Sequence, residues 1–293
     1  MKSLIDFKNI DNKEAKKLIK LTIDGQANPV KEDIPNTVVM KFDEPSTRTK
    51  VSFSAAANKL GLYQIDLTRE NSSSEKGESL EDEIITLIEL GVDIMVLRTT
   101  SEDIECYKSF KNIGIISAGF GKVSHPTQSI VDATTILTNK KHDFSKPFVF
   151  IGDLKHSRVF NSATELFPKL GIEIGICAPE EFLPNNHNNF KKFENITEAI
   201  NKSSAIEILR VQKERIDEIN SFNFDNYVNN FQLNKNNIDN ADDELKILHP
   251  MPMNVGIEIS EKASLHNKFK YKDQLSFGVP SRIASYMYVM EKI

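Results

Sequence analysis

The side chains best suited to chemistry lie in one short run, Ser46-Thr47-Arg48-Thr49, which follows a β-branched segment and Pro45. A helix that begins near Thr47 would present unpaired backbone N–H groups and the positive end of its dipole to one side. The hydroxyl groups add hydrogen-bond donors, and the Arg48 guanidinium can bind two phosphate oxygens at once. The run indicates a phosphate site, although in isolation such a run is more often an ordinary helix cap with a surface arginine.

Other candidate groups are spread along the chain. His125 precedes a proline, and taken alone it is more often a structural histidine. Arg210 and Gln212 fall at the end of an expected strand, where a period of two sends both side chains to one side. Arg158 follows another expected strand and, like Arg210, is suited to binding a carboxylate. For residues 210–215 the alternative is a solvated charged face.

The spacing of glycines, histidines and cysteines disfavours several cofactor chemistries. The chain has no GxxxxGK phosphate loop, Gly119-x-Gly121 lacks the rest of the dinucleotide fingerprint, and the six histidines never form HExxH. Cys106 and Cys177 show no CxxC pairing, so neither a disulfide framework nor a cysteine zinc site is supported. We expect no metal and no organic cofactor.

The composition is that of a globular protein, with 39% hydrophobic and 27% charged residues in 293. A formal net charge of -5 provides no basic surface for nucleic acid. No apolar run approaches the length of a membrane span, and the first ten residues lack the apolar core of an export signal. We expect a cytoplasmic protein that binds neither nucleic acid nor membrane.

The elements that must position the candidate groups alternate along the chain. Short β-branched runs predict strands, and segments with helical spacing lie between them. The strands are expected at residues 37–42, 94–97, 113–117, 148–152, 172–177, 206–211 and 245–248, and the helices at residues 12–23, 47–60, 79–90, 127–138, 157–170 and 281–290. This alternation predicts an α/β fold in which parallel sheets are flanked by helices.

The chain is long enough for two domains. The polar stretch at residues 139–147 separates a helix from a new strand, and we place the domain boundary there. Residues 1–139 are expected to form one domain, completed by residues 276–293 because the C-terminal helix returns to it, and residues 140–275 to form the other. Two asparagine-rich stretches, residues 185–189 and 223–240, suit long surface loops, and a compositional drift toward Asn and Lys accounts for them equally well.

The motifs and their order resemble those of the aspartate/ornithine carbamoyltransferase family. The resemblance rests on Ser46-Thr47-Arg48-Thr49 after a strand and on the later His125-Pro126-Thr127-Gln128, and it covers most of the chain. Further matching segments are Lys76-Gly77-Glu78-Ser79, Leu97-Arg98, Gly152-Asp153-Leu154-Lys155-His156-Ser157-Arg158, Arg210-Val211-Gln212-Lys213-Glu214-Arg215 and His249-Pro250-Met251-Pro252. The resemblance implies a carbamoyl phosphate-binding domain at residues 1–139 with 276–293 and an aspartate-binding domain at residues 140–275.

The resemblance also implies a role for each matching side chain in the donor site. Carbamoyl phosphate would be bound by Ser46, Thr47, Arg48, Thr49, Arg98, His125, Gln128, Met251 and Pro252, the last two through their backbone. Arg48, Thr49, His125 and Lys76 would carry catalysis. Ser72 and Lys76 lie in a polar loop whose family counterpart reaches into an adjacent subunit, so a homotrimer with shared sites is implied. The run Ser72-Ser73-Ser74 leaves open which serine makes that contact.

The second substrate distinguishes the branches of the family, because aspartate brings two carboxylates and ornithine a distal ammonium. By resemblance, Arg158 binds the α-carboxylate, Arg210 and Gln212 bind the side-chain carboxylate, Lys76 contacts aspartate, and Glu214 orients Arg210. The ornithine branch usually has His-Cys-Leu-Pro and a Ser-Met-Gly loop, and this chain has neither.

We therefore expect carbamoyl transfer from carbamoyl phosphate to L-aspartate, in de novo pyrimidine biosynthesis. The alternatives are ornithine or N-acylornithine as acceptor and, in another class, a catalytically silent metabolite-binding relative. Two departures from the family pattern, Thr99-Thr100 after Arg98 and Val255 after Asn254, bear on subunit contacts or loop stability more than on the reaction. Whether regulatory or dihydroorotase chains join the trimer stays open.

Overall fold

The computed structural model of the chain describes residues 1–27, 36–68, 77–138, 142–212 and 222–292. Contacts between residues divide it into two compact units. The first unit comprises residues 1–134, 161–166 and 275–293, and the second comprises residues 135–160 and 167–274.

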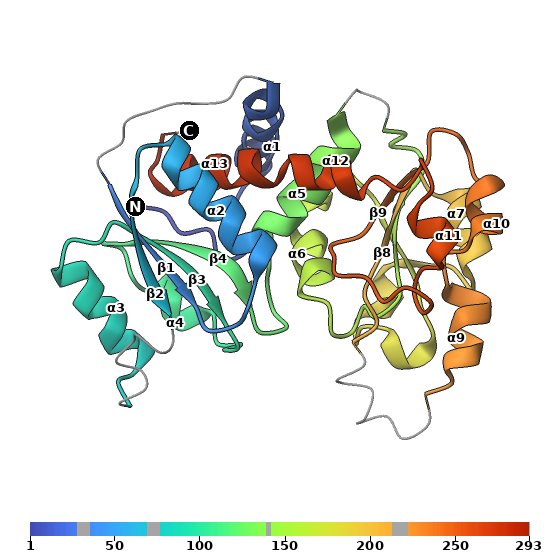
Figure 1. Cartoon of the computed structure of the whole chain (residues 1–293), viewed down its shortest axis with the longest axis horizontal. Helices are drawn as coiled ribbons and strands as arrows, with labels where there is room; N and C mark the ends of the chain where they lie inside the picture. The colour runs from blue at the N-terminus through green and yellow to red at the C-terminus, as the bar shows by residue number, and fades with distance from the viewer. Residues whose placement is uncertain (28–35, 69–76, 139–141, 213–221, 293) are drawn as a thin grey trace. The chain divides into compact units, whose positions relative to one another are not determined.

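The first unit is built on a parallel sheet with strand order β2-β1-β3-β4 among the described residues. Its strands are β1 (Thr37–Phe42), β2 (Tyr63–Thr68), β3 (Ile94–Thr99) and β4 (Gly114–Phe120). Its helices are α1 (Asn12–Ala27), α2 (Thr47–Lys59), α3 (Leu80–Glu89), α4 (Glu105–Lys108) and α13 (Gly278–Val289), and it contains most of α5 (Pro126–Leu137) and of α6 (Arg158–Leu166). Figure 1 shows α1, α2 and α13 on one side of this sheet and α3 and α4 on the other.

Most residues of the central strands β1 and β3 are buried, and successive side chains point to opposite faces of the sheet. Both faces of the sheet are therefore apolar. On the side of α3 and α4, Val39 and Met95 belong to a core cluster with Ile84 of α3 and Tyr107 of α4. On the other side, the Tyr286 hydroxyl of α13 lies 3.9 Å from Met40 Sδ. Burial of each such large side chain contributes about 1.5–3 kcal/mol.

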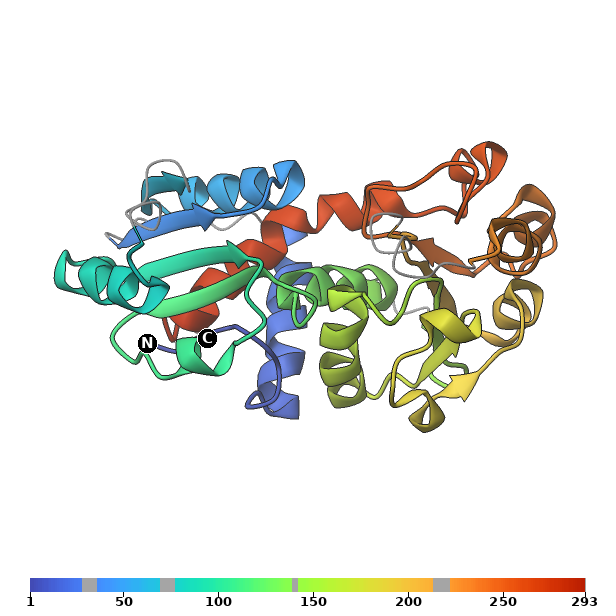
Figure 2. The ribbon, with the colours of Figure 1, turned by 90° about the horizontal axis from the view of Figure 1, so that it is seen from below.

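The C-terminal helix α13 packs against α1 and α2, as both views of the ribbon show (Figures 1 and 2). Its Tyr286 ring meets the Phe53 ring of α2 edge to face, with ring centres 5.7 Å apart. The expectation that the end of the chain returns to the first sheet is therefore confirmed. Residues on all sides of α13 are buried, which requires that neighbouring elements surround the helix.

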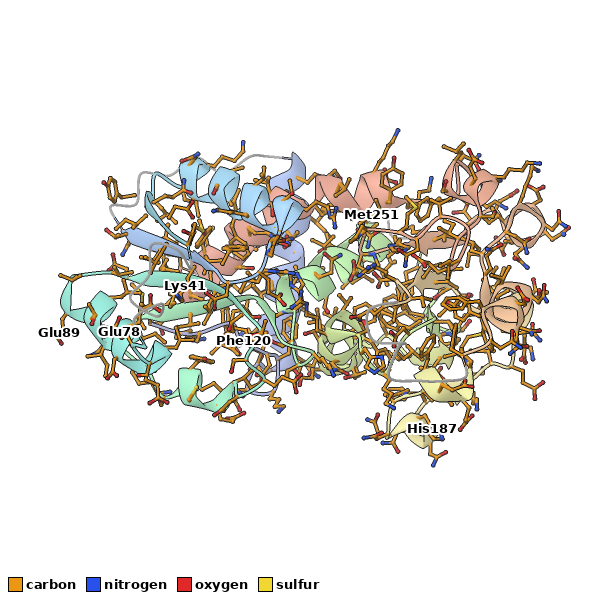
Figure 3. All side chains as sticks on the ribbon, turned by 60° about the horizontal axis from the view of Figure 1, so that its bottom comes forward. Lys41, Glu78, Glu89, Phe120, His187 and Met251 are labelled. Carbon is orange, nitrogen blue, oxygen red and sulfur yellow. The ribbon has the colours of Figure 1, made fainter. Side chains whose placement is uncertain are left out.

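One charged side chain lies in the middle of the first sheet. Lys41, labelled in Figure 3, is 1% exposed. Its ammonium lies 2.9 Å from Glu83 Oε2 in the first turn of α3 and 3.5 Å from Asp43 Oδ1. Through these two ion pairs, Lys41 joins α3 to Asp43, which lies between β1 and the Ser46–Thr49 run.

The second unit is built on a parallel sheet with strand order β7-β6-β5-β8-β9 among the described residues. Its strands are β5 (Phe148–Ile151), β6 (Ile174–Cys177), β7 (Lys191–Lys192), β8 (Ala205–Ile208) and β9 (Lys246–Leu248). Its helices are α7 (Ile196–Lys202), α9 (Phe224–Phe231), α10 (Lys235–Asp239), α11 (Glu261–Ser264) and most of α12 (Tyr271–Ser276), with 3-10 turns η4 (Pro168–Leu170), η5 (Glu180–Phe182) and η6 (His187–Asn189). The rings of Phe148, Phe150, Phe160 and Phe167 contact one another in its core in tilted and edge-to-face arrangements.

Two expectations about elements in this part of the chain were wrong. Residues 223–240 are not a long loop but contain α9 and α10, because asparagine side chains cap both helices: Asn223 accepts from the Asn226 N–H, and Asn234 accepts from the Asn237 N–H. The helix expected at residues 157–170 stops at Leu166, and the 3-10 turn η4 follows because Pro168 cannot continue an α-helix.

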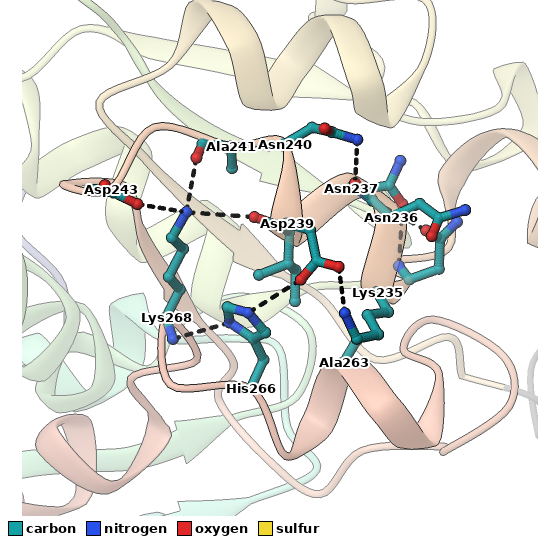
Figure 4. A network of polar contacts seen from close by, with 12 residues as sticks. Lys235, Asn236, Asn237, Asp239, Asn240, Ala241, Asp243, Ala263, His266 and Lys268 are labelled. Atoms are coloured by element: carbon teal, nitrogen blue, oxygen red, sulfur yellow. Dashed lines mark hydrogen bonds and ion pairs between the residues drawn. The ribbon is translucent and has the colours of Figure 1, made fainter.

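A polar network holds α10 to the segment that follows α11 (Figure 4). The Lys268 ammonium donates to Ala241 O at 2.7 Å and lies 3.2 Å from Asp243 Oδ1. His266 Nδ1 accepts from the Lys268 N–H at 3.2 Å, and its other ring nitrogen lies 3.4 Å from Asp239 Oδ1. Lysine at the carbonyl end of a short helix stabilises that end.

Candidate functional site

The Ser46–Thr49 run forms the start of helix α2, as the sequence predicts. Ser46 is the N-cap residue, with extended backbone at φ -160, and its side chain makes no capping hydrogen bond. The first intrahelical bond runs from Lys50 N–H to Ser46 O, so the N–H groups of the first turn precede any helical partner. The helix start therefore offers N–H groups and hydroxyl groups to an anion.

Arg98 lies beside this helix start because β3 is the neighbour of β1. Phe42 is paired with Arg98 in register, and the Asp43 N–H donates to Arg98 O at 2.9 Å. The Arg98 guanidinium contacts two groups, Ala118 O at 3.1 Å and Glu44 Oε2 at 3.2 Å. Partial burial lowers the pKa of the other arginine, Arg48, through desolvation. A bound dianion would compensate that desolvation.

His125 and Gln128 lie at the start of α5, where Pro126 occupies the first turn. His125 is buried, its N–H donates to Ser162 Oγ at 2.7 Å, and its Nδ1 lies 3.5 Å from Thr127 Oγ1. The Gln128 side-chain amide donates to Asp132 Oδ1 at 2.8 Å, one helical turn further on. Both side chains are thus oriented by groups beneath them.

The turn between β5 and α6 brings Arg158 to a second helix start. Gly152 has φ 112, and a side chain there would come within 2.8 Å of Leu209 O, so only glycine fits. Asp153 is buried, and its carboxylate oxygens lie 2.9 and 3.2 Å from His156 Nδ1. The Ser157 hydroxyl accepts from the Phe160 N–H at 3.1 Å, which leaves Arg158 in the first turn of α6.

Gln212 is joined to that turn. Its N–H donates to Asp153 Oδ2 at 3.5 Å, and its side-chain amide donates to His156 O at 2.9 Å. Strand β8 ends at Ile208 rather than at residue 211 as expected, because the last ladder bond on this side is that of the Leu209 N–H to Ile151 O. Arg210 and Gln212, both half-buried, therefore follow the strand, and contacts with the β5–α6 turn, not the period of a strand, orient Gln212.

The segment after β9 contains Met251 and Pro252. Met251 has φ 56, the left-handed region that side-chain-bearing residues rarely adopt, and the Met251–Pro252 peptide is cis. The Asn254 side-chain amide donates to Val211 O at 2.8 Å. This contact places the segment next to Val211, the residue between Arg210 and Gln212.

Two family models match the chain in succession. The carbamoyl phosphate-binding domain of aspartate/ornithine carbamoyltransferases matches residues 2–138, and the aspartate/ornithine-binding domain of the same enzymes matches residues 145–289. The chain belongs to the aspartate/ornithine carbamoyltransferase family.

Relatives within this family support the same placement. The chain is 31% identical to the aspartate carbamoyltransferase catalytic subunit of Legionella pneumophila (strain Lens), over 97% of each chain. Its structure is similar to that of Trypanosoma cruzi aspartate transcarbamoylase in complex with carbamoyl aspartate and phosphate, with a TM-score of 0.83 at 26% identity over 97% of this chain and 95% of the other. It is also similar to the catalytic subunit of M. jannaschii aspartate transcarbamoylase, with a TM-score of 0.82 at 28% identity over 100% and 99% of the two chains.

Three residues that the family resemblance assigned lie outside the described residues, namely Ser72, Lys76 and Glu214. In the described part of the chain, no cluster of three or more His, Cys, Asp or Glu side chains has the arrangement of a metal site. No helix there has the length and apolar character needed to span a membrane.

Sequence reasoning missed Arg282, a buried residue of α13 that contacts both the His125–Gln128 motif and helix α2. Its guanidinium donates to Ser281 Oγ at 2.8 Å and reaches Thr127 O of α5 at 3.5 Å, and it lies 5.5 Å from the Phe53 ring of α2. Burial lowers its pKa to about 10. The available signal was a single charged residue in a mostly apolar helix, a charge that must have partners if it is buried.

Proposed function

We propose that this chain transfers the carbamoyl group of carbamoyl phosphate to the amino group of L-aspartate, giving N-carbamoyl-L-aspartate and phosphate. The observation that carries the proposal is the set of cationic and amide groups in the second unit: Arg158 at the start of α6, and Arg210 beside Gln212, which is bonded to the same turn. Two arginines suit the two carboxylates of aspartate and would repel the ammonium of ornithine.

In the donor site, the α2 start and Arg98 bind the phosphate dianion. Ser46, Thr47, Arg48 and Thr49 supply hydroxyl, guanidinium and backbone N–H groups, and Arg98 approaches from the adjacent strand. Gln128 and the backbone of Met251 and Pro252 hold the carbamoyl amide and the reacting amine. The similarity to relatives that carry the name aspartate carbamoyltransferase over nearly the whole chain supports this assignment.

The reaction is a direct attack of the neutral aspartate amine on the carbonyl carbon of carbamoyl phosphate. A C–N bond forms, the carbonyl oxygen becomes an oxyanion in the tetrahedral intermediate, and the C–O bond to phosphate then breaks. Arg48, Thr49, His125 and Lys76 stabilise the developing charge, and the departing phosphate accepts the amine proton. Holding two anions in reactive positions and stabilising the oxyanion each lower the barrier by several kcal/mol.

For the acceptor, we assign Arg158 to the α-carboxylate and Arg210 with Gln212 to the side-chain carboxylate, with Lys76 as a further contact. The buried Asp153 carboxylate orients both sides of this arrangement, because it contacts His156 in the α6 turn and the Gln212 N–H. Residues 1–139 with 276–293 would then serve the donor and residues 140–275 the acceptor.

We further propose a homotrimer in which Ser72 and Lys76 complete the site of an adjacent subunit. Exposed apolar side chains on two elements support assembly: Tyr63 and Ile65 of the edge strand β2 are 70% and 39% exposed, and Val51 of α2 is 63% exposed. The two elements are neighbours, since Lys50 Nζ lies 2.7 Å from Asp66 Oδ2. Apolar residues on an edge strand are usually covered in an assembly.

The product places the reaction in de novo pyrimidine biosynthesis, and we assign the protein to the cytoplasm on the basis of its composition. Regulatory or dihydroorotase chains are the partners that the family resemblance raises, and a pull-down with each would test them.

The proposed activity is tested by supplying carbamoyl phosphate with L-aspartate, L-ornithine or N-acetyl-L-ornithine and measuring carbamoylated product by chromatography. We expect turnover with aspartate only. Arg210→Leu should reduce kcat/KM for aspartate about 10²-fold or more, because a carboxylate loses its bidentate partner. The matched control is Lys192→Leu, which removes an exposed cation that pairs with Glu180. Turnover of ornithine, or no turnover at all, would refute the assignment.

A further inference from the structure

A buried histidine lies directly behind the backbone that we assign to the carbamoyl group. His249 is 1% exposed and is separated from Met251, labelled in Figure 3, by one residue. The imidazole Nδ1 of His249 accepts a hydrogen bond from the Met251 backbone N–H at 2.8 Å, and the backbone N–H of His249 donates to Gln274 Oε1 at 3.0 Å. Neither the family motifs nor the proposed mechanism gives this imidazole a role.

The hydrogen bond from Met251 determines which form of the imidazole is present. A ring nitrogen that accepts an N–H carries no proton, so the proton of the neutral ring is on Nε2. On that side Glu258, which is fully buried, places Oε1 3.4 Å from Nε2. The Glu258 carboxylate also accepts the Asn254 N–H. A carboxylate facing Nε2 favours the form of the ring that leaves Nδ1 able to accept.

The accepting nitrogen matters because Met251 is held in an unfavourable backbone conformation. At φ 56 a residue with a side chain costs roughly 1–2 kcal/mol relative to its ordinary conformations. Such a conformation persists only where surrounding contacts hold it. The Met251 N–H is bonded to His249 and to no backbone carbonyl among the described residues, so the imidazole is the contact that fixes it.

The same segment is joined to the acceptor side of the second unit. Asn254, whose N–H is bonded to Glu258, donates through its side chain to Val211 O at 2.8 Å. The Gln232 amide closes the other end of the segment by donating to Gly256 O and Ile257 O at 2.9 and 3.0 Å. His249 and Glu258 are therefore at the centre of a network that reaches the residue between Arg210 and Gln212.

We propose that His249, held in its Nε2-protonated form by Glu258, is a positioning residue for carbamoyl transfer: its Nδ1 fixes the Met251 backbone in the conformation that presents the Met251–Pro252 segment to the carbamoyl group. This inference rests on the proposed function, because it assumes that the segment addresses carbamoyl phosphate. Phosphate alone makes no use of the segment, since its ligands are in the first unit.

Two substitutions separate the two nitrogens of the ring. His249→Asn places an amide oxygen near the position of Nδ1, and His249→Gln places its amide near the position of Nε2. We expect His249→Asn to keep kcat/KM for carbamoyl phosphate within about threefold of the wild type and His249→Gln to lower it about 10²-fold, the effect of a small misplacement of a binding group. Dissociation constants for inorganic phosphate, measured by calorimetry, should stay within about twofold in both.

The contrast with phosphate distinguishes positioning from a general loss of structure. Both variants lose the same ring, so a purely structural role would lower activity in both in parallel with the thermal midpoint. Equal kinetics of the two variants, or an unaltered His249→Gln enzyme, would overturn the proposal.

Glu258→Gln provides an independent test if His249→Gln does not fold. Its amide N–H can face Nε2 and so favours protonation of Nδ1, which should weaken carbamoyl phosphate binding and leave phosphate binding intact. Wild-type binding of both ligands would overturn the proposal. The kinetic comparison of the His249 variants requires turnover of aspartate, whereas the Glu258→Gln test measures binding of carbamoyl phosphate and phosphate without an acceptor. A failure of aspartate turnover in the wild type would therefore contradict the proposed function and leave the binding test of His249 in place.

Discussion

At the scale of single residues, the donor site that we propose includes the guanidinium of Arg48, which is already partly removed from water. Arg48 lies in the first turn of α2, two residues after the N-cap Ser46, so its guanidinium and the first-turn N–H groups can bind the same phosphate. Lysine carries the same charge at this position but offers one point of contact in place of two. The effect of a substitution at Arg48 on phosphate binding should therefore depend on the hydrogen-bond geometry of the new side chain more than on its charge.

We expect Arg48→Lys to lower kcat/KM for carbamoyl phosphate by about 10²–10³-fold, the usual effect of removing one oriented donor from a developing oxyanion. The thermal midpoint should change little, because Arg48 belongs to the exposed residues of α2. Steady-state kinetics and a melting curve check both statements. Lys59→Ala, in the last turn of the same helix, is the control. Retention of wild-type kinetics in Arg48→Lys would show that charge alone suffices.

A second residue-scale prediction concerns pH. Burial and the neighbouring Lys246 lower the pKa of His142 from its ordinary value of 6.5. As the pH falls through 6.5, the unfolded chain therefore takes up this proton while the folded chain still excludes it, so stability is complete above 6.5 and decreases below it.

Melting curves between about pH 7.5 and 5.5 would test this prediction. The midpoint of the wild type should fall more steeply with acid than that of His142→Phe, which keeps a ring next to Phe144. His187→Phe, in the surface turn η6, serves as the control and should follow the wild type. Parallel curves for the wild type and His142→Phe would contradict the prediction.

At the scale of elements, the strands and helices that the sequence predicts are those whose apolar residues are buried. The central strands β1, β3, β5 and β8 are runs of β-branched and aromatic residues, which is why parallel sheets could be predicted. Strand β2 was missed although Tyr63, Ile65 and Leu67 alternate with polar residues. Its apolar positions are exposed or half-buried in this chain, so its pattern serves an edge and not the core.

The candidate site was predictable to a similar extent. The start of α2 could be located because Pro45, three residues with hydroxyl groups and an arginine occupy five consecutive positions. Arg282 and Glu258 could not be assigned, since their partners are brought close by folding across more than 100 residues or by a turn that has no sequence signature. Asparagine at helix starts was misread as loop composition, because a cap and a loop use the same residue.

The buried pair of Lys41 with Glu83 gives a prediction for the junction of β1 and α3. Lys41→Met should destabilise the fold by about 3–5 kcal/mol, because it leaves a buried carboxylate without its strongest partner. The double variant Lys41→Met/Glu83→Leu should recover much of that loss, since two apolar side chains of similar volume replace the pair. Denaturant unfolding of the single and double variants measures both values. If the double variant were less stable than Lys41→Met, the pair would have to stabilise the fold by more than charge neutralisation.

At the scale of the whole molecule, the proposed sharing of sites predicts complementation. Subunits with Lys76→Ala mixed with subunits with His125→Ala should regain activity above either variant alone, because some sites then combine an intact His125 with an intact Lys76 from the neighbour. The control replaces the second partner by the double variant Lys76→Ala/His125→Ala, with which every site lacks Lys76. Absence of recovery in trimers that have exchanged subunits would indicate self-contained sites.

The exposed apolar side chains of β2 and α2 make the thermal stability of this protein depend on its concentration. In the homotrimer that we propose, another copy would shield exposed apolar side chains such as Tyr63, which is 70% exposed, and Val51, which is 63% exposed, from water. By mass action, diluting the protein removes that shield, so its melting temperature should drop on dilution even though no contact within a subunit has changed. A cell that makes too little of the chain would hold a less durable protein, and not merely less of it.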